Sequence, residues 1–198
     1  MRRRQGEQAG WSLVELVMVI GVSLVVAGIA MAALAPLGAT ARALGAARYL
    51  SAVLQRERIE AVRTGRTCGL RFDDDGSAIG FTRVADGNGN GVRSAEIADG
   101  TDPMRGARVR LADAFSGVGF AIVDNVPSID GGAGLAEGAD PIRLGSSILA
   151  FAPTGSATSG TLYLASADRR QFAVRILGAT GRVRIYEFER ATGRWVTR

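Results

Sequence analysis

The chain has 198 residues, of which 47% are hydrophobic and 22% charged, which suits one folded domain with an appended segment. It contains no histidine and no lysine, so Ser-His and Cys-His nucleophile pairs, histidine-ligated metal sites, Schiff-base chemistry and the P-loop lysine are excluded. A single cysteine, Cys68, excludes an intramolecular disulfide, and we expect it to lie in the core. We therefore expect a protein that is not an enzyme and that has no cofactor site apart from one candidate calcium loop.

The net charge of +5 is unevenly distributed. Residues 71–140 hold six arginines and twelve acidic residues, whereas residues 141–198 hold nine arginines and three acidic residues. An acidic middle followed by a basic C-terminal part fits an ordinary solvated surface, and it also fits a charged partner.

The N-terminal part contains a candidate membrane segment. Leu16–Ala41 has 26 residues without a charge, and a bilayer core of about 30 Å needs roughly 20 apolar residues in a helix. The arginines at residues 2–4 would hold the N-terminus in the cytoplasm. A signal peptide cut after Ala32 or Ala35 is the competing interpretation, but the run is longer than that pattern. Glu15 lies at the edge of the run, where burying its charge in a membrane costs free energy unless a partner pairs with it.

Glu15 belongs to a motif. Ala9–Leu16, with the sequence AGWSLVEL, resembles the type IV pilin and pseudopilin signature of a glycine, an aromatic residue, Ser or Thr, Leu, an aliphatic residue and Glu. The resemblance implies that a prepilin peptidase cuts after Gly10 and methylates the new N-terminus at Trp11, where the family usually has phenylalanine. Glu15 then lies one helical turn from that amine. In a filament it would neutralise the amine of a neighbouring subunit.

The helix is expected to continue beyond the membrane segment. Residues 42–65 carry apolar side chains at spacings of three and four, and Gly65 supplies a stop. These side chains are Leu44, Ala47, Leu50, Val53, Leu54 and Ala61. We therefore divide the chain into a leader at 1–10, a membrane or filament-core helix at 11–41, an amphipathic second half at 42–65, and a β domain at 66–198 with a loop-rich insert at 85–141.

Short apolar or alternating runs after Gly65 predict strands. The predicted strands are Thr67–Phe72, Ile79–Val84, Val109–Leu111, Val118–Val123, Ile148–Phe151, Thr161–Ala165, Phe172–Leu177 and Arg182–Phe188. The prediction is an α+β fold, in which a long N-terminal helix with a membrane-spanning first half packs on a mainly antiparallel sheet, as in pilins. The C-terminal portion resembles the GspH/FimT-type domain in its Phe-x-Pro-x-Gly run from Phe151, its SGTLYL strand and its closing Gly-Arg-Val-Arg at 181–184.

The insert contains a candidate calcium loop. Oxygen ligands alternate along DGNGNG, with a glycine at the sixth position, and the ligands would be Asp86, Asn88, Asn90 and Glu96. The acid stands at the eleventh position, whereas an EF-hand needs a bidentate glutamate at the twelfth, and flanking helices are not evident. A hairpin tip rich in turn-forming residues is the favoured interpretation.

Arg182 and Arg184 are candidate DNA-binding residues, because they project to one face of a predicted strand and some FimT-like minor pilins, which have a similar Gly-Arg-x-Arg tail, are associated with DNA uptake. Tyr186 and Trp195 would add stacking on single strands. Further arginines of the candidate basic patch are Arg169, Arg170, Arg175, Arg190, Arg194 and Arg198. The alternative is a closing strand whose arginines face solvent or pair with nearby acidic residues such as Glu187.

The resemblance implies a minor pseudopilin of a type II secretion system, anchored in the bacterial inner membrane with its C-terminal domain in the periplasm. Its partners would be the prepilin peptidase, other pilin or pseudopilin subunits and the inner-membrane assembly platform. The alternative is a FimT-like minor pilin of a type IV pilus that contacts DNA. A signal-anchored periplasmic protein is a weaker alternative.

Overall fold

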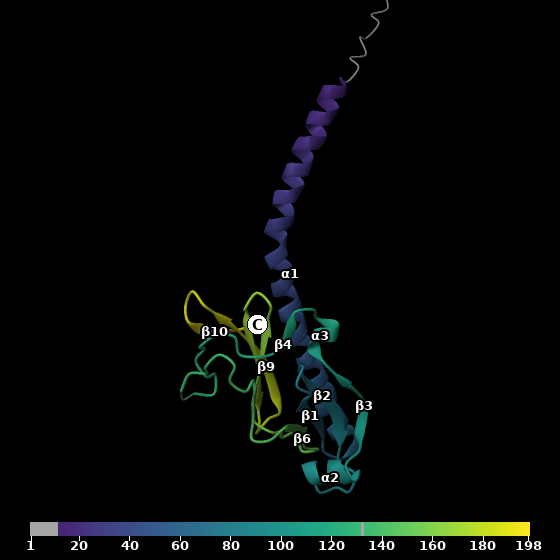
Figure 1. Ribbon diagram of the computed structural model, residues 1–198. Helices are drawn as coiled ribbons and strands as arrows, with labels where there is room; N and C mark the ends of the chain where they lie inside the picture. The colour runs from purple at the N-terminus through teal and green to yellow at the C-terminus, as the bar shows by residue number, and fades with distance from the viewer. Residues whose placement is uncertain (1–11, 132) are drawn as a thin grey trace, which may run out of the picture. The chain divides into compact units, whose positions relative to one another are not determined.

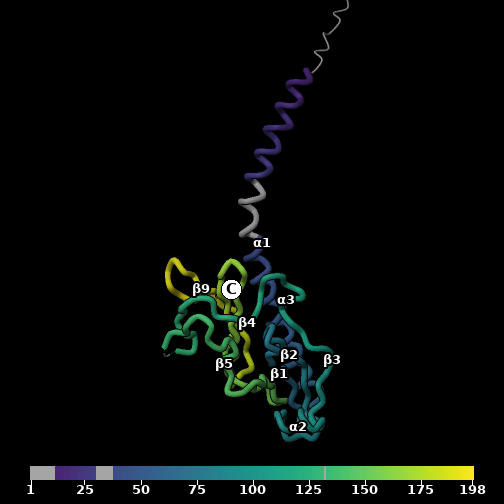
Figure 2. The backbone as a smooth tube through the Cα atoms, in the orientation of Figure 1, coloured from purple at the N-terminus to yellow at the C-terminus, as the bar shows by residue number. Residues whose placement is uncertain are grey.

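The computed structural model describes residues 12–131 and 133–198, apart from the side chains of residues 30–37 (grey in Figure 2 with the other undescribed residues). The chain divides into two compact units, Met1–Gly38 and Ala39–Arg198. Helix α1, Leu13–Thr64, begins in the first unit and ends in the second. The leader, Gly10 and Trp11 lie outside the described residues, and so do the side chains of residues 30–37 within the predicted membrane segment.

In the second unit, α1 buries one stripe of side chains and ends where Gly65 adopts a φ of 65°. The fully buried apolar members of this stripe are Ala43, Ala46, Ala47, Leu50, Leu54 and Ala61. Leu44 and Val53, which the sequence pattern also assigned to this stripe, are partly buried against the same core. Small residues at its N-terminal end let strands and loops approach the helix closely.

Two antiparallel sheets lie beside this part of α1 (Figure 1). The four-stranded sheet has the order β3-β2-β1-β6, and its strands are β1 Cys68–Asp74, β2 Ile79–Ala85, β3 Met104–Val109 and β6 Ile148–Phe151. The six-stranded sheet has the order β10-β9-β8-β7-β4, with β5 also paired to β7. Its strands are β4 Val118–Phe120, β5 Ile142–Leu144, β7 Gly160–Ser166, β8 Gln171–Leu177, β9 Arg182–Glu189 and β10 Arg194–Thr197. The predicted α+β class is therefore confirmed.

Both sheets contribute alternate residues to one main core around α1. Leu70 and Phe72 of β1 and Leu162 and Leu164 of β7 are buried in it, because side chains two apart on a strand share a face. Cys68 is fully buried in the same core, as predicted, and this burial raises the pKa of its thiol. A smaller core covers the opposite face of the six-stranded sheet.

The segment at 85–141 is more ordered than the predicted insert. It contains α2 Ser94–Asp99, β3, α3 Leu111–Ala114 and β4. The predicted strand at Val109–Leu111 is wrong beyond Val109, because β3 ends there and Leu111 begins α3. The strand predicted over Val118–Val123 ends at Phe120. Beyond it, the side-chain amide of Gln171 donates to the Ala121 carbonyl oxygen and accepts the Val123 amide, so these backbone groups do not pair with a strand.

Candidate functional site

The first described residues of α1 present apolar side chains on every side of the helix. Those recorded as exposed are Leu13, Val14, Leu16, Val17, Met18, Val19, Ile20, Val22, Leu24, Val25, Val26 and Ile29. Their exposed fractions run from 49% to 78%. A helix that is apolar all round is stable only when protein or lipid covers it. This surface is therefore of the kind that protein or lipid covers.

Glu15 is the only charged residue between Leu13 and Ile29, and it lies in the first turn of α1. Ser12 precedes the helix as its N-cap, because its Oγ accepts a hydrogen bond from the Val14 amide at 3.2 Å. Ser12 and Glu15 have the spacing of a capping box, in which Glu or Gln at the third helical position supports the cap. Glu15 is thus a candidate capping residue by its spacing, besides the pairing that the sequence motif suggests.

Among the residues described, no helical segment meets the length and hydropathy needed to cross a membrane.

The candidate calcium loop is held by its own hydrogen bonds. Asp86 is 3% exposed, and its Oδ1 accepts the amides of Asn88 at 3.0 Å and Gly89 at 2.6 Å, while Oδ2 accepts that of Gly91 at 2.8 Å. Burial alone would raise the pKa of Asp86, but these backbone amides together outweigh it and lower that pKa. The carboxylate therefore serves as the anchor of a turn.

The other predicted ligands point to the same conclusion. Glu96, at the start of α2, accepts the side-chain amides of Asn88 at 3.2 Å and Asn90 at 2.8 Å. Fully buried Asp102, which the sequence analysis did not single out, accepts the amides of Gly87 at 2.9 Å and Arg93 at 2.8 Å. Over residues 12–131 and 133–198 no cluster of three acidic or cysteine side chains is arranged to hold a metal ion. The observed contacts make the loop a self-contained hydrogen-bonded turn.

Arg182 and Arg184 lie on β9 with exposed side chains on one face. In the described part of the chain neither side chain has a recorded ion pair or hydrogen bond. Gly181 fixes the turn that precedes them, because its φ is 60° and a Cβ there would lie 2.6 Å from the carbonyl oxygen of Gly155. The glycine of this Gly-Arg-Val-Arg run is thus required by backbone geometry.

Most of the other arginines in the predicted basic patch are neutralised within the chain. Arg169 contacts Asp124 and Glu137, and Arg190 contacts Asp124. Arg170 and Arg198 both bind Glu187, at 3.1 Å and 2.7 Å. The broad patch expected from the sequence is therefore reduced to a smaller group of unpaired cations.

The aromatic side chains near this patch are also engaged. Trp195 packs on Tyr163 and Phe188, with ring centroids 5.8 Å and 5.3 Å away, and its Nε1 donates to the carbonyl oxygen of Pro127 at 2.8 Å. Tyr186 packs partly buried against the same cluster. Both rings are thus held in this cluster while remaining partly exposed.

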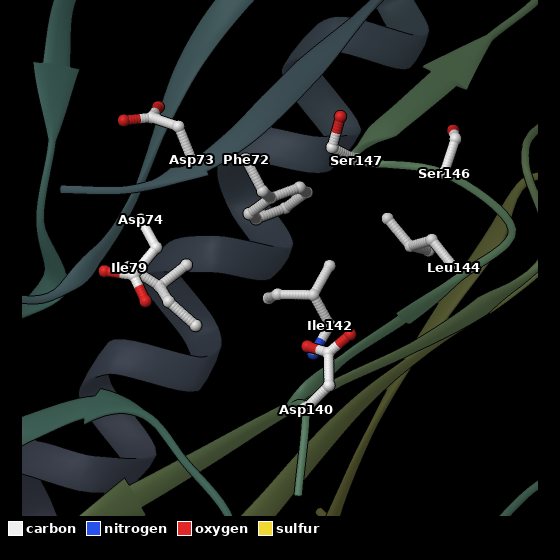
Figure 3. A pocket seen from close by; sticks show the side chains of 9 residues that line it. All are labelled: Phe72, Asp73, Asp74, Ile79, Asp140, Ile142, Leu144, Ser146 and Ser147. Atoms are coloured by element: carbon white, nitrogen blue, oxygen red, sulfur yellow. The ribbon is translucent and has the colours of Figure 1, made fainter. Parts of the chain in front are cut away.

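A cavity of about 400 Å³ lies between the β1–β2 hairpin and the segment around β5 (Figure 3). Phe72, Ile79, Ile142 and Leu144 point into it. Its carboxylates have local partners, because Asp73 binds Arg108 at 2.6 Å, Asp74 accepts the Gly76 amide, and Asp140 accepts the Ile142 amide. No pairing of a nucleophile with a base is recorded among these lining residues, and the cavity offers an apolar floor with a polar rim.

One buried ion pair was not predicted from the sequence. Glu57 of α1 is fully buried, and its Oε1 accepts a hydrogen bond from Arg83 Nε on β2 at 2.5 Å. Its Oε2 has no hydrogen-bond partner in the described structure. The spacing could have indicated this, because Glu57 stands three residues after Leu54 and four before Ala61, on the buried stripe.

Comparisons with family models, with curated proteins and with solved structures find no match to this chain.

Proposed function

We propose that the chain is a minor pseudopilin of a type II secretion system. The observation that carries the proposal is the all-round apolar surface of Leu13–Ile29, with Glu15 as its only charge, directly after the Gly10–Trp11 junction in the sequence. Such a surface suits a helix stored in the inner membrane and then packed among the helices of a filament. The prepilin peptidase, other filament subunits and the inner-membrane assembly platform are the partners in this proposal.

In this proposal, cleavage after Gly10 supplies a positive charge that pairs with the Glu15 carboxylate. It leaves a cationic amine on Trp11, which would enter an apolar filament core beside the carboxylate of a neighbouring Glu15. An unpaired charge in such a core costs about 3–5 kcal/mol, so only the register that pairs amine with carboxylate is stable. Glu15 therefore aligns subunits as they assemble.

The test uses two conservative variants of the full chain, produced together with a prepilin peptidase. Glu15→Gln removes the charge but keeps a capping-box side chain, whereas Ser12→Ala removes the cap but keeps the charge. We expect both variants to lose residues 1–10 and to gain an N-terminal methyl group by mass spectrometry. We expect only Glu15→Gln to lose filament assembly, by between about a hundredfold and a few thousandfold, with secretion lost in parallel.

Two results would contradict the proposal. The first is an uncut chain, or a chain cut after Ala32 or Ala35, which would support a signal-anchored periplasmic protein. The second is normal assembly of Glu15→Gln together with defective assembly of Ser12→Ala, which would reduce Glu15 to a capping residue.

A FimT-like minor pilin that contacts DNA is the second candidate function. The exposed, unpaired side chains of Arg182 and Arg184 on one face of β9 favour it. DNA titrated across a salt series should bind the native chain, and Arg182→Ala/Arg184→Ala should reduce the salt slope by about 2. Arg48→Ala/Arg56→Ala on α1 makes the same change in charge and serves as the control. Equal losses in both double variants would point to general electrostatics and against this function.

A further inference from the structure

Three arginines form a row across the six-stranded sheet. The pairing register places Arg143 of β5 opposite Thr161 of β7, Thr161 opposite Arg175 of β8, and Arg175 opposite Arg184 of β9. Residues directly opposite each other in antiparallel strands project to the same face. Adjacent strands are about 4.8 Å apart, so the row spans about 14 Å, the length of about four residues of extended chain.

The row borders a polar cavity of about 600 Å³, which Arg143 and Arg175 line together with Ser128, Ser159, Asp130 and Asp140. Strand β5, labelled in Figure 2, lies close against β7 at this point. Gly160 permits the approach, because a Cβ at this position would lie 2.3 Å from the carbonyl oxygen of Arg143. The fold thus brings Arg143 to the edge of the cavity.

One carboxylate of the chain already occupies the middle of the row. Asp130 Oδ2 accepts the Thr161 hydroxyl at 2.6 Å, and Asp130 Oδ1 lies 3.0 Å from Arg175 Nε. Arg175 also donates from Nη1 to the carbonyl oxygen of Ile129 at 3.0 Å. Arg143 and Arg184, on either side, have no recorded ion pair or side-chain hydrogen bond within the described ranges. The middle of the row thus binds a carboxylate, and the positive charges of the two outer arginines are not neutralised by an ion pair with any described residue.

We propose that the row Arg143–Arg175–Arg184 binds an acidic, extended segment of a partner protein, one carboxylate of which competes with Asp130 for Arg175. The contact of Asp130 shows which ligand chemistry the donors accept. The rings of Trp195 and Tyr186 near β9 are held in an aromatic cluster, whereas the row itself already binds a carboxylate, so an acidic protein segment fits the observed contacts better than stacked bases do. Asp130 then acts as an internal competitor that weakens binding of the partner.

The size of this competition follows from exposure. The side chains of Arg175 and Asp130 are 32% and 37% exposed, and ion pairs with this much solvent contact are worth at most about 1 kcal/mol. Asp130 would therefore lower the apparent affinity for a partner carboxylate by up to about fivefold.

The experiment uses the full chain in a neutral detergent and a fluorescein-labelled peptide of six aspartates, followed by fluorescence anisotropy across a salt series. We expect salt-sensitive binding that Arg143→Ala/Arg175→Ala abolishes and that Arg48→Ala/Arg56→Ala retains. We expect Asp130→Asn to tighten binding about fivefold, whereas Asp113→Asn, an equal change of charge on exposed α3, leaves it within about twofold. Circular dichroism establishes that each variant is folded.

Several results would overturn the proposal. One is no binding by either the native chain or Asp130→Asn, and another is equal tightening by Asp130→Asn and Asp113→Asn. Selective binding of a labelled oligothymidine through the same arginines, without binding of the peptide, would assign the row to nucleic acid. Salt-sensitive self-association in sedimentation experiments, abolished by Arg143→Ala/Arg175→Ala, would assign it to a second copy of this chain.

Discussion

The buried pair of Glu57 and Arg83 gives the sharpest prediction about stability. Glu57 is fully buried and the Arg83 side chain is 28% exposed, so Arg83→Met would leave a carboxylate inside the protein without its only recorded hydrogen-bond partner. Removing one member of a buried pair costs about 3–5 kcal/mol. Because Arg83 retains some solvent contact, we expect the lower end, about 3 kcal/mol. For a unit of this size this corresponds to a fall in Tm of about 6–12 °C.

The measurement is urea and thermal unfolding of residues 39–198, the unit that contains all the described core residues. Arg63→Met is the matched control, because Arg63 pairs with Glu60 at 2.7 Å but has a side chain that is 69% exposed. We expect that control to cost less than about 1 kcal/mol. The double variant Glu57→Leu/Arg83→Met removes both charges and should come within about 1 kcal/mol of the native protein.

An Arg83→Met variant that lost no more free energy of unfolding than Arg63→Met would refute this prediction. The prediction would also be refuted if the double variant were as unstable as Arg83→Met, since the cost would then arise from lost packing of the arginine side chain and not from an isolated charge.

Two further predictions concern backbone geometry and pH. Gly160→Ala should destabilise residues 39–198 by about 2 kcal/mol or more, because the new Cβ would lie 2.3 Å from the Arg143 carbonyl oxygen. The same variant should expose the β5 amides to hydrogen exchange. Gly145→Ala is the control, since its Cβ would meet no atom within 4 Å. Since the folded-state pKa of Asp86 is lowered, its contribution to stability is present above its unfolded pKa of about 3.9 and is lost as pH falls through the folded value. The protection factors of the Gly89 and Gly91 amides, taken relative to the intrinsic exchange rate at each pH, should therefore fall in acid. Asp86→Asn should remove this acid dependence, and an unchanged pH profile in the variant would contradict the prediction.

The elements that sequence patterns predicted well are those with a strong apolar period. β7 and β8 carry alternating or continuous apolar residues because both of their faces are covered, one by the main core and the other by the smaller core. The second half of α1 shows its buried stripe for the same reason, since side chains three and four apart meet the same neighbours.

The missed elements lack that signal. β3 reads MRGARV, with no fully buried residue, and β5 and β10 are strands of three and four residues at sheet edges. Edge strands bury less and can be polar, so their pairing with a neighbour decides their conformation more than their own composition does. The six residues of α2 are likewise too few for a period to appear.

The sequence alone determined the α+β class, the extent of the apolar N-terminal run and the chemical types excluded by the absence of histidine and lysine, because these depend on composition and on local period. Tertiary structure alone decided which arginines remain unpaired and which three share a row. That outcome depends on strand register and on carboxylates distant in the chain: Asp130 stands 45 residues before Arg175, and only the folded sheet brings them to 3.0 Å.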